Sequence, residues 1–134
     1  MEIKSPIAEV GCTSDVLFDF VANLENLEPL LPSEQVQSFQ LDGDVCRFKV
    51  VGGFDVVIKK TSEERPHLIL FSSQQGTPIR FGLEVRIESV EDRANVQVVC
   101  DADLNPFMRM MAEKPLQNIF DGMVEKIVNR FPAA

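Results

Sequence analysis

The feature that most constrains the fold is a regular alternation of apolar and polar residues between Val36 and Leu104. Successive side chains of a β-strand point to opposite faces, so this period of two predicts strands with one apolar and one polar face. The alternation is clearest for Ile79, Phe81, Leu83, Val85 and Ile87, and then for Val96, Val98, Cys100, Ala102 and Leu104. Turn-forming residues, among them Asp42-Gly43-Asp44 and Gly52-Gly53, separate such segments at short intervals. The pattern predicts an antiparallel meander with one face in the core and the other in water.

The rest of the chain before residue 79 is less regular. Further strands are expected at Val36–Leu41, Val45–Val51, Phe54–Thr61 and His67–Ser73. Glu2 to Val10 is also strand-like, but Pro6 has no N–H to donate and favours a sheet edge or a distortion. Thr13 or Ser14 can cap a following helix. The apolar stripe of that helix is expected to be Val16, Leu17, Phe20, Val21 and Leu24. Pro29 and Pro32 should end or break the helical region.

The last segment has the periodicity of a helix. Its apolar face consists of Leu116, Ile119, Phe120, Met123, Val124, Ile127, Val128 and Phe131. Pro115 suits the first turn of this helix, and the stretch from Asn105 to Met111 is expected to form a separate short helix or turn. So apolar a helix needs a large partner surface, which the sheet offers. The expected fold is α+β: a curved antiparallel sheet of six or seven strands wrapped around a long C-terminal helix, with one or two short helices after the first strand. A cavity is expected where the concave sheet diverges from the helix.

Composition limits the classes of function. The chain has 134 residues, 45% of them hydrophobic, which fits a single domain spanning residues 1–134. A net charge of −8 argues against nucleic-acid binding and disfavours electrostatic docking of the whole protein on anionic membranes. No apolar run approaches the roughly 20 residues of a membrane span, and no signal peptide is recognised. Cys12, Cys46 and Cys100 are odd in number and widely spaced, so we expect reduced thiols and a cytoplasmic location.

The order of the expected elements resembles the START-like, birch-pollen-allergen-like superfamily, also called SRPBCC, over nearly the whole chain. The segment from Asp101 to Phe120, DADLNPFMRMMAEKPLQNIF, is similar to the end of the last strand and the entry to the final helix in small bacterial members. The segment from Ser14 to Val21, SDVLFDFV, is similar to their first helix. The resemblance implies a helix-grip fold with a cavity for lipids, sterols, polyketides or other apolar ligands. Some members are enzymes such as polyketide cyclases and others bind partner proteins, so the resemblance does not fix the function.

Few residues point to catalysis or to a metal. His67 is the only histidine, which excludes a site built from several histidines, and we expect neither a metal nor a cofactor. The strand carboxylates fall by period on the face toward water: Glu84, Glu88, Asp101 and Asp103. Asp55 and Lys59 share one face of a strand, and they are the best acid–base pair if that face is the inner one.

We therefore expect a protein that binds or carries a small hydrophobic ligand and needs no catalytic residue. The expected ligand contacts are Phe48, Val50, Phe81, Leu83, Val85, Val98, Cys100, Met108, Met111, Leu116, Phe120, Met123 and Ile127. The methionines among them, with Phe107, could form an adaptable lining or gate. One alternative is a cyclase- or hydrolase-type enzyme that uses Asp55, Lys59, His67 or a cysteine. Another is an interaction module that binds a protein through the sheet edge or the methionine-rich helix entrance.

Overall fold

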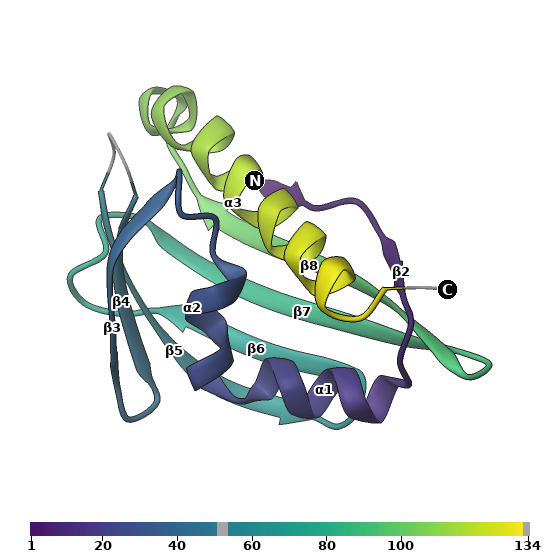
Figure 1. Cartoon of the computed structure of the whole chain (residues 1–134). Helices are drawn as coiled ribbons and strands as arrows, with labels where there is room; N and C mark the ends of the chain where they lie inside the picture. Colours follow the sequence, from purple (N-terminus) through teal and green to yellow (C-terminus); the bar gives the residue numbers. More distant parts are fainter. Residues whose placement is uncertain (51–53, 133–134) are drawn as a thin grey trace.

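The sheet expected from the alternating segment is present, and all helices lie on its concave side (Figure 1). The computed structural model describes residues 1–50 and 54–132. Its elements in chain order are β1 (Glu2–Lys4), β2 (Ala8–Val10), α1 (Ser14–Ala22), η1 (Leu24–Asn26), α2 (Leu27–Leu30), β3 (Val36–Asp42), β4 (Val45–Val50), β5 (Asp55–Glu64), β6 (Leu68–Ser73), β7 (Arg80–Val90), β8 (Arg93–Asp103) and α3 (Pro106–Arg130). The strands form one antiparallel sheet in the order β1-β8-β7-β6-β5-β4-β3, and β2 also pairs with β8.

The two longest strands, β7 and β8, confirm the predicted alternation. Leu83 is the register partner of Cys100 and Val85 that of Val98, and all four are at most 5% exposed. Val57 departs from the simple pattern, because it lies on the face of β5 opposite the cavity and is nevertheless buried. The connection between β6 and β7 folds over it, with the Gln74 N–H donating to the Val57 carbonyl oxygen at 2.7 Å.

Glycine and proline positions explain the turns and the number of strands. Gly43 has a φ of +63° in the turn between β3 and β4, where Asp42 pairs with Val45, which confirms the predicted hairpin. The predicted turn at Gly52-Gly53 lies outside the described residues. Pro6 interrupts the first strand-like segment, so β1 and β2 are separate short strands and the sheet has eight strands instead of six or seven.

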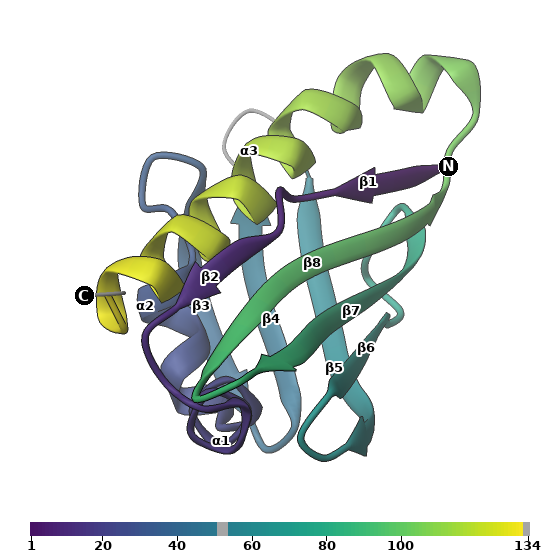
Figure 2. The ribbon, with the colours of Figure 1, turned by 90° about the vertical axis from the view of Figure 1, so that its right-hand side faces the viewer.

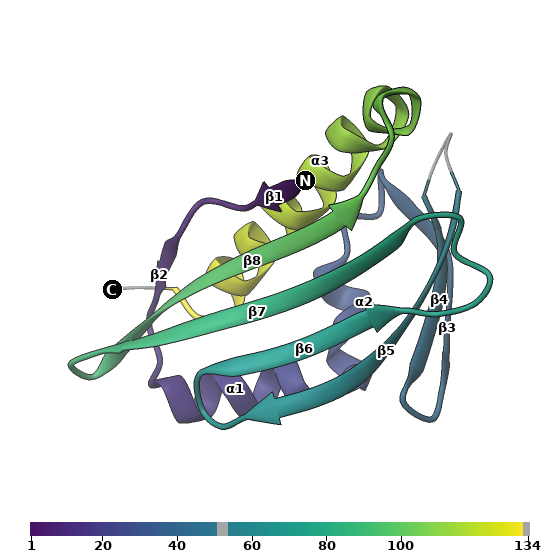
Figure 3. The ribbon, with the colours of Figure 1, turned by 180° about the vertical axis from the view of Figure 1, so that it is seen from behind.

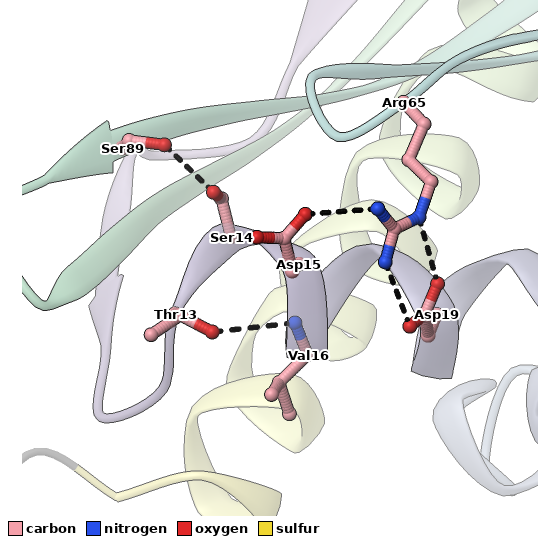
Figure 4. Close-up of polar contacts among 7 residues, drawn as sticks. All are labelled: Thr13, Ser14, Asp15, Val16, Asp19, Arg65 and Ser89. Atoms are coloured by element: carbon pink, nitrogen blue, oxygen red, sulfur yellow. Dashed lines mark hydrogen bonds and ion pairs between the residues drawn. The ribbon is translucent and has the colours of Figure 1, made fainter.

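Helix α1 begins at the predicted cap, where the Val16 N–H donates to the Thr13 hydroxyl oxygen at 3.4 Å. Its buried face differs from the predicted one, because Phe18 is 2% exposed while Val16 is 49% exposed. The helix is oriented by contacts beyond its own apolar stripe. The buried Ser14 accepts a hydrogen bond from Ser89 of β7 at 2.7 Å, which turns the first residues of the helix toward the sheet (Figure 4).

An ion-pair cluster attaches the outer side of α1 to the turn between β5 and β6 (Figure 4). The Arg65 guanidinium donates to both carboxylate oxygens of Asp19 at 3.1 and 3.0 Å and lies 3.0 Å from Asp15. The same guanidinium lies over the Phe18 ring, 5.9 Å from its centre. Hydrogen bonding from Arg65 lowers the pKa of the Asp19 carboxyl. The cluster therefore favours the ionised carboxylate and this position of α1.

Helix α3 corrects the prediction for the C-terminal segment. A single helix runs from Pro106 to Arg130 without the break expected before Pro115. Asn105 caps it by accepting from the Met108 N–H at 2.8 Å, and Pro106 occupies the first turn, where a missing N–H costs little. Pro115 therefore lies inside the helix, where its ring leaves the carbonyl of the residue four positions earlier without the usual donor.

The second half of α3 packs into the concave side of the sheet and against α2. At Gly122 an added Cβ would lie 3.0 Å from the Pro32 Cγ, so the absence of a side chain allows this close approach. As predicted, the helical region ends before Pro32, with Leu31 just beyond the short helix α2, whereas Pro29 lies inside α2 and does not end it. Figures 2 and 3 show that α3 crosses the sheet obliquely and that its first turns extend past the end of β8.

Candidate functional site

A small cavity lies between the sheet and the second half of α3. Its volume is about 20 Å³. Its lining consists of Leu27, Leu31, Phe48, Val56, Ile58, Phe81, Leu83, Leu116, Ile119, Phe120 and Met123. A water molecule needs roughly 10–15 Å³ on this measure, whereas pockets for drug-sized ligands have about 300–1,000 Å³. The core in this conformation is therefore nearly filled, and the remaining space is bounded by side chains without charge or hydrogen-bonding groups.

The structure divides the predicted ligand contacts into three groups. Phe48, Phe81, Leu83, Leu116, Phe120 and Met123 line the cavity. Val50, Val85, Val98, Cys100 and Ile127 are buried in the same core but outside the lining. Met108 is half-buried against the core, and Met111 is 57% exposed and lies away from the cavity.

Several lining residues were missed by the sequence analysis. Val56 and Ile58 alternate with polar or outward residues of β5, but the sequence of this strand alone does not say which of its two faces is the inner one. Ile119 belongs to the predicted apolar helix face but not to the predicted ligand contacts, although it lies one turn beyond Leu116. Leu27 and Leu31 are four residues apart, a spacing that places both on one side of a helical turn.

The titratable residues considered for catalysis lie away from this cavity. Asp55 is exposed, and the Lys59 ammonium is 3.8 Å from Asp44 at the surface. His67 is exposed in the turn before β6, with its Nδ1 3.1 Å from the Ile87 carbonyl oxygen. None of these residues contributes to the lining. Among the residues that the structure describes, the buried polar side chains are Ser5 and Ser14, both at the N-terminal side of the fold.

Two of the cysteines, Cys46 and Cys100, are buried in the sheet and have raised thiol pKa values. Burial raises the pKa of the Cys46 thiol to about 11, with the nearby Asp44 carboxylate as a smaller cause. Burial also raises the pKa of the Cys100 thiol to about 12, again with a neighbouring carboxylate, Asp101, contributing. The thiolate is the nucleophilic form of cysteine, so both side chains are protonated and unreactive near neutral pH.

Comparisons with known proteins give the fold. No protein-family model and no curated protein matches the sequence. A START superfamily protein from Mycobacterium smegmatis matches the structure with a TM-score of 0.74 and 13% identity, covering 97% of this chain and 96% of that chain. XoxI from Bacillus cereus matches with a TM-score of 0.76 and 11% identity, covering 97% and 94%. Norcoclaurine synthase from Thalictrum flavum, in complex with dopamine and hydroxybenzaldehyde, matches with a TM-score of 0.70 and 15% identity, covering 96% and 87%.

These similarities extend over almost the whole length of each chain, and they agree with the observed order of elements. The protein therefore has a START-like helix-grip fold. At these identities the likeness defines the fold and leaves the activity to be argued from the site itself. None of the described helices, including the 25-residue α3, is both long and apolar enough to cross a membrane.

Proposed function

We propose that this protein binds a small hydrophobic ligand between its sheet and the second half of α3. The observation that carries the proposal is the wholly apolar lining of the cavity at that place. Burial of apolar ligand surface would supply the affinity, at about 25 cal/mol per Å² removed from water. The likeness to norcoclaurine synthase supports ligand binding in a general way, because one of the similar structures is that enzyme in complex with dopamine and hydroxybenzaldehyde.

The cavity of about 20 Å³ holds little more than a single water molecule, so a ligand must displace part of the lining. Met123 is the lining residue best suited to this, because methionine is flexible, and Phe120 lies beside it in the lining, three residues earlier in α3. The expected ligand is a slender apolar molecule, such as an acyl chain, that enters between α3 and the sheet as these side chains change rotamer.

The proposal is tested by native mass spectrometry of freshly purified protein and by displacement of a fluorescent fatty acid. The matched variants are Val56→Ile, which adds one methylene at the cavity, and Val98→Ile, which adds the same group to the core outside the lining. Because the added methylene fills the free space, Val56→Ile should weaken fatty-acid binding by at least roughly fivefold, and Val98→Ile should leave it unchanged in folded protein.

Circular dichroism and urea unfolding establish that both variants are folded before binding is compared. Absence of binding across a broad lipid panel would contradict the proposal. Equal affinity of the Val56→Ile variant and the unmodified protein would also contradict it, because the ligand would then lie elsewhere.

A further inference from the structure

The polar side chains buried in the described part of the protein are all hydrogen-bonded within the chain. The cavity lining between the sheet and α3 consists of hydrocarbon side chains and one thioether, that of Met123. The two buried polar residues lie elsewhere: Ser5 accepts from the Val98 N–H at 2.9 Å, and Ser14 accepts from Ser89 at 2.7 Å. A core that held the polar headgroup of a ligand would instead contain donors or acceptors aimed at it and left unpaired.

One cation lies on the inner face of the sheet, in a strand that contributes to the cavity lining. Lys60 follows the lining residue Ile58 by two positions in β5, so both side chains point to the concave side. Its register partner Phe71 is buried in the core. The Lys60 ammonium donates to the Ala22 carbonyl oxygen at the end of α1 at 3.0 Å and forms an ion pair with Glu63. Its charge is therefore compensated within the chain, and a carboxylate ligand would have to displace Glu63 to replace that pair.

Two cations of α3 near the ends of the lining belong to the surface. Lys126 is one turn beyond the lining residue Met123 and is half-buried, and a lysine in this position packs its stem along the protein while its ammonium stays in water. Arg109 lies seven residues before Leu116 on the same side of the helix. Its side chain is 57% exposed, and its Nε is 3.5 Å from a carboxylate oxygen of Glu113. An anionic headgroup that met either cation would do so outside the lining.

We propose that the ligand of this cavity is an uncharged slender molecule, such as an ester of a fatty acid, in preference to an ionised acid or an amine. The inference rests on the proposed function and adds the chemical class of the ligand to it. An unpaired charge costs too much free energy to enter an apolar lining, so a charged amphiphile must keep its headgroup in water. Its first methylenes then stay outside too, and each methylene left in water lowers the affinity about fourfold.

The test compares two isomers of the same composition, methyl nonanoate and decanoic acid, near neutral pH, where the acid is ionised. Titrations of methyl-labelled protein, monitored by NMR through the Leu83, Ile119 and Met123 methyl groups, give both dissociation constants. The ester should bind at least roughly tenfold more tightly than decanoate, because about two more of its methylenes are buried. Decylammonium, which has a similar chain and the opposite charge, should also bind at least roughly tenfold more weakly than the ester.

Lysine variants show whether a cation of the protein holds the acid. Lys60→Met and Lys126→Met each remove one of the two lysines next to lining residues. Lys59→Met is the matched control, because it removes the same charge from the outer face of β5, where Lys59 lies 3.8 Å from Asp44. Circular dichroism establishes that the three variants are folded. Their affinities for decanoate should differ by less than about twofold.

Binding of decanoate or decylammonium at least as tight as that of the ester would overturn the inference and would leave the ligand site in place. A large loss of decanoate binding in Lys60→Met or Lys126→Met, but not in Lys59→Met, would overturn it as well, because that lysine would then bind the carboxylate. A different result separates the two proposals: if none of the three molecules shifted the cavity methyl groups of the folded protein, the proposed function would fail and this inference with it.

Discussion

The two halves of α3 are both rich in large apolar residues, yet they have opposite environments. In the second half Leu116, Ile119 and Phe120 are at most 4% exposed, because the concave sheet and α2 surround them. In the first half Phe107 and Met110 are at least 70% exposed, because their spacing places them on the outer face of the helix, in line with Lys114. Composition alone therefore does not decide burial here. The helix face on which a residue lies does, and the outer side of the first half is not covered by any part of the chain that the structure describes.

The largest expected difference in the free energy of unfolding is between two variants that each lose a large side chain, one in each half of α3. Phe120→Ala should lower the free energy of unfolding by about 3–5 kcal/mol, because it deletes a ring from the cavity lining and leaves a void. Met110→Ala should change it by less than about 0.5 kcal/mol, because the side chain is exposed. Urea unfolding of both variants measures the difference. Similar losses in the two variants would mean that the first half is packed in solution.

Pro115 lies where the two halves meet, and its replacement tests how independent they are. Pro115→Ala should raise the free energy of unfolding by about 1–2 kcal/mol, because the new N–H can donate to the Met111 carbonyl inside the helix. Amide hydrogen exchange should become slower in residues 107–114 in particular. A loss of stability in urea would show that packing of the proline ring outweighs the restored hydrogen bond.

A substitution at Gly122 tests how closely the second half of α3 approaches Pro32. Gly122→Ala should lower the free energy of unfolding by about 1 kcal/mol, although alanine is the better helix former, because its Cβ would lie 3.0 Å from the Pro32 ring. Asn118→Ala, at an exposed position of the same helix, is the control and should be neutral or slightly stabilising. Thermal or urea unfolding gives both values. A gain in stability for Gly122→Ala would mean that the segment around Pro32 shifts readily away from α3.

The smallest effect on stability is expected for helix α1, which is held against the sheet by surface ion pairs as well as by apolar packing. Arg65→Gln should return the lowered pKa of Asp19 toward its ordinary value of 3.8 and should slightly lower the melting temperature near neutral pH. Because the folded-state pKa of Asp19 is depressed, its stabilising contribution is complete above 3.8 and is lost as the pH falls through the folded value.

The stability difference between the Arg65→Gln variant and the unmodified protein should therefore narrow in acid. Melting temperatures measured from neutral pH down to below the Asp19 pKa provide the check, together with an NMR titration of the carboxyl. A difference that stays constant with pH would assign the role of Arg65 to its contact with Phe18 instead of its ion pair.

The sequence predicted those parts of the fold in which one regular period extends over many residues. The alternation in β7 and β8 placed Leu83, Val85 and Val98 on the inner face, where the structure has them. The turn at Gly43 was predictable because glycine is favoured in tight hairpin turns, and its φ in the structure is indeed left-handed. The continuity of α3 was not predicted, because Pro115 is typical of a first helical turn and the local signal at Asn105-Pro106 is equally typical.

The candidate site was predicted less completely, because a cavity depends on where elements end and how they are packed. Met111 belongs to an apolar stretch like that of Met123, but it lies on the outer face of α3 and is 57% exposed, whereas the neighbouring Ala112 is buried. Val56 and Ile58 line the cavity, although their inner position depends on the register between β4 and β5 and not on the sequence of β5 alone. Periodicity gives a face for each residue, and only the assembled structure gives its neighbours.

The most direct test of a ligand site between the sheet and α3 is a titration of methyl-labelled protein with decanoic acid, monitored by NMR. The Leu83, Ile119 and Met123 methyl groups, which line the cavity, should shift progressively with saturation. The methyl group of Ile3, buried outside the lining, should shift little. An unchanged spectrum, or shifts confined to Met110 and Met111 at the exposed end of α3, would contradict a binding site between the sheet and the helix.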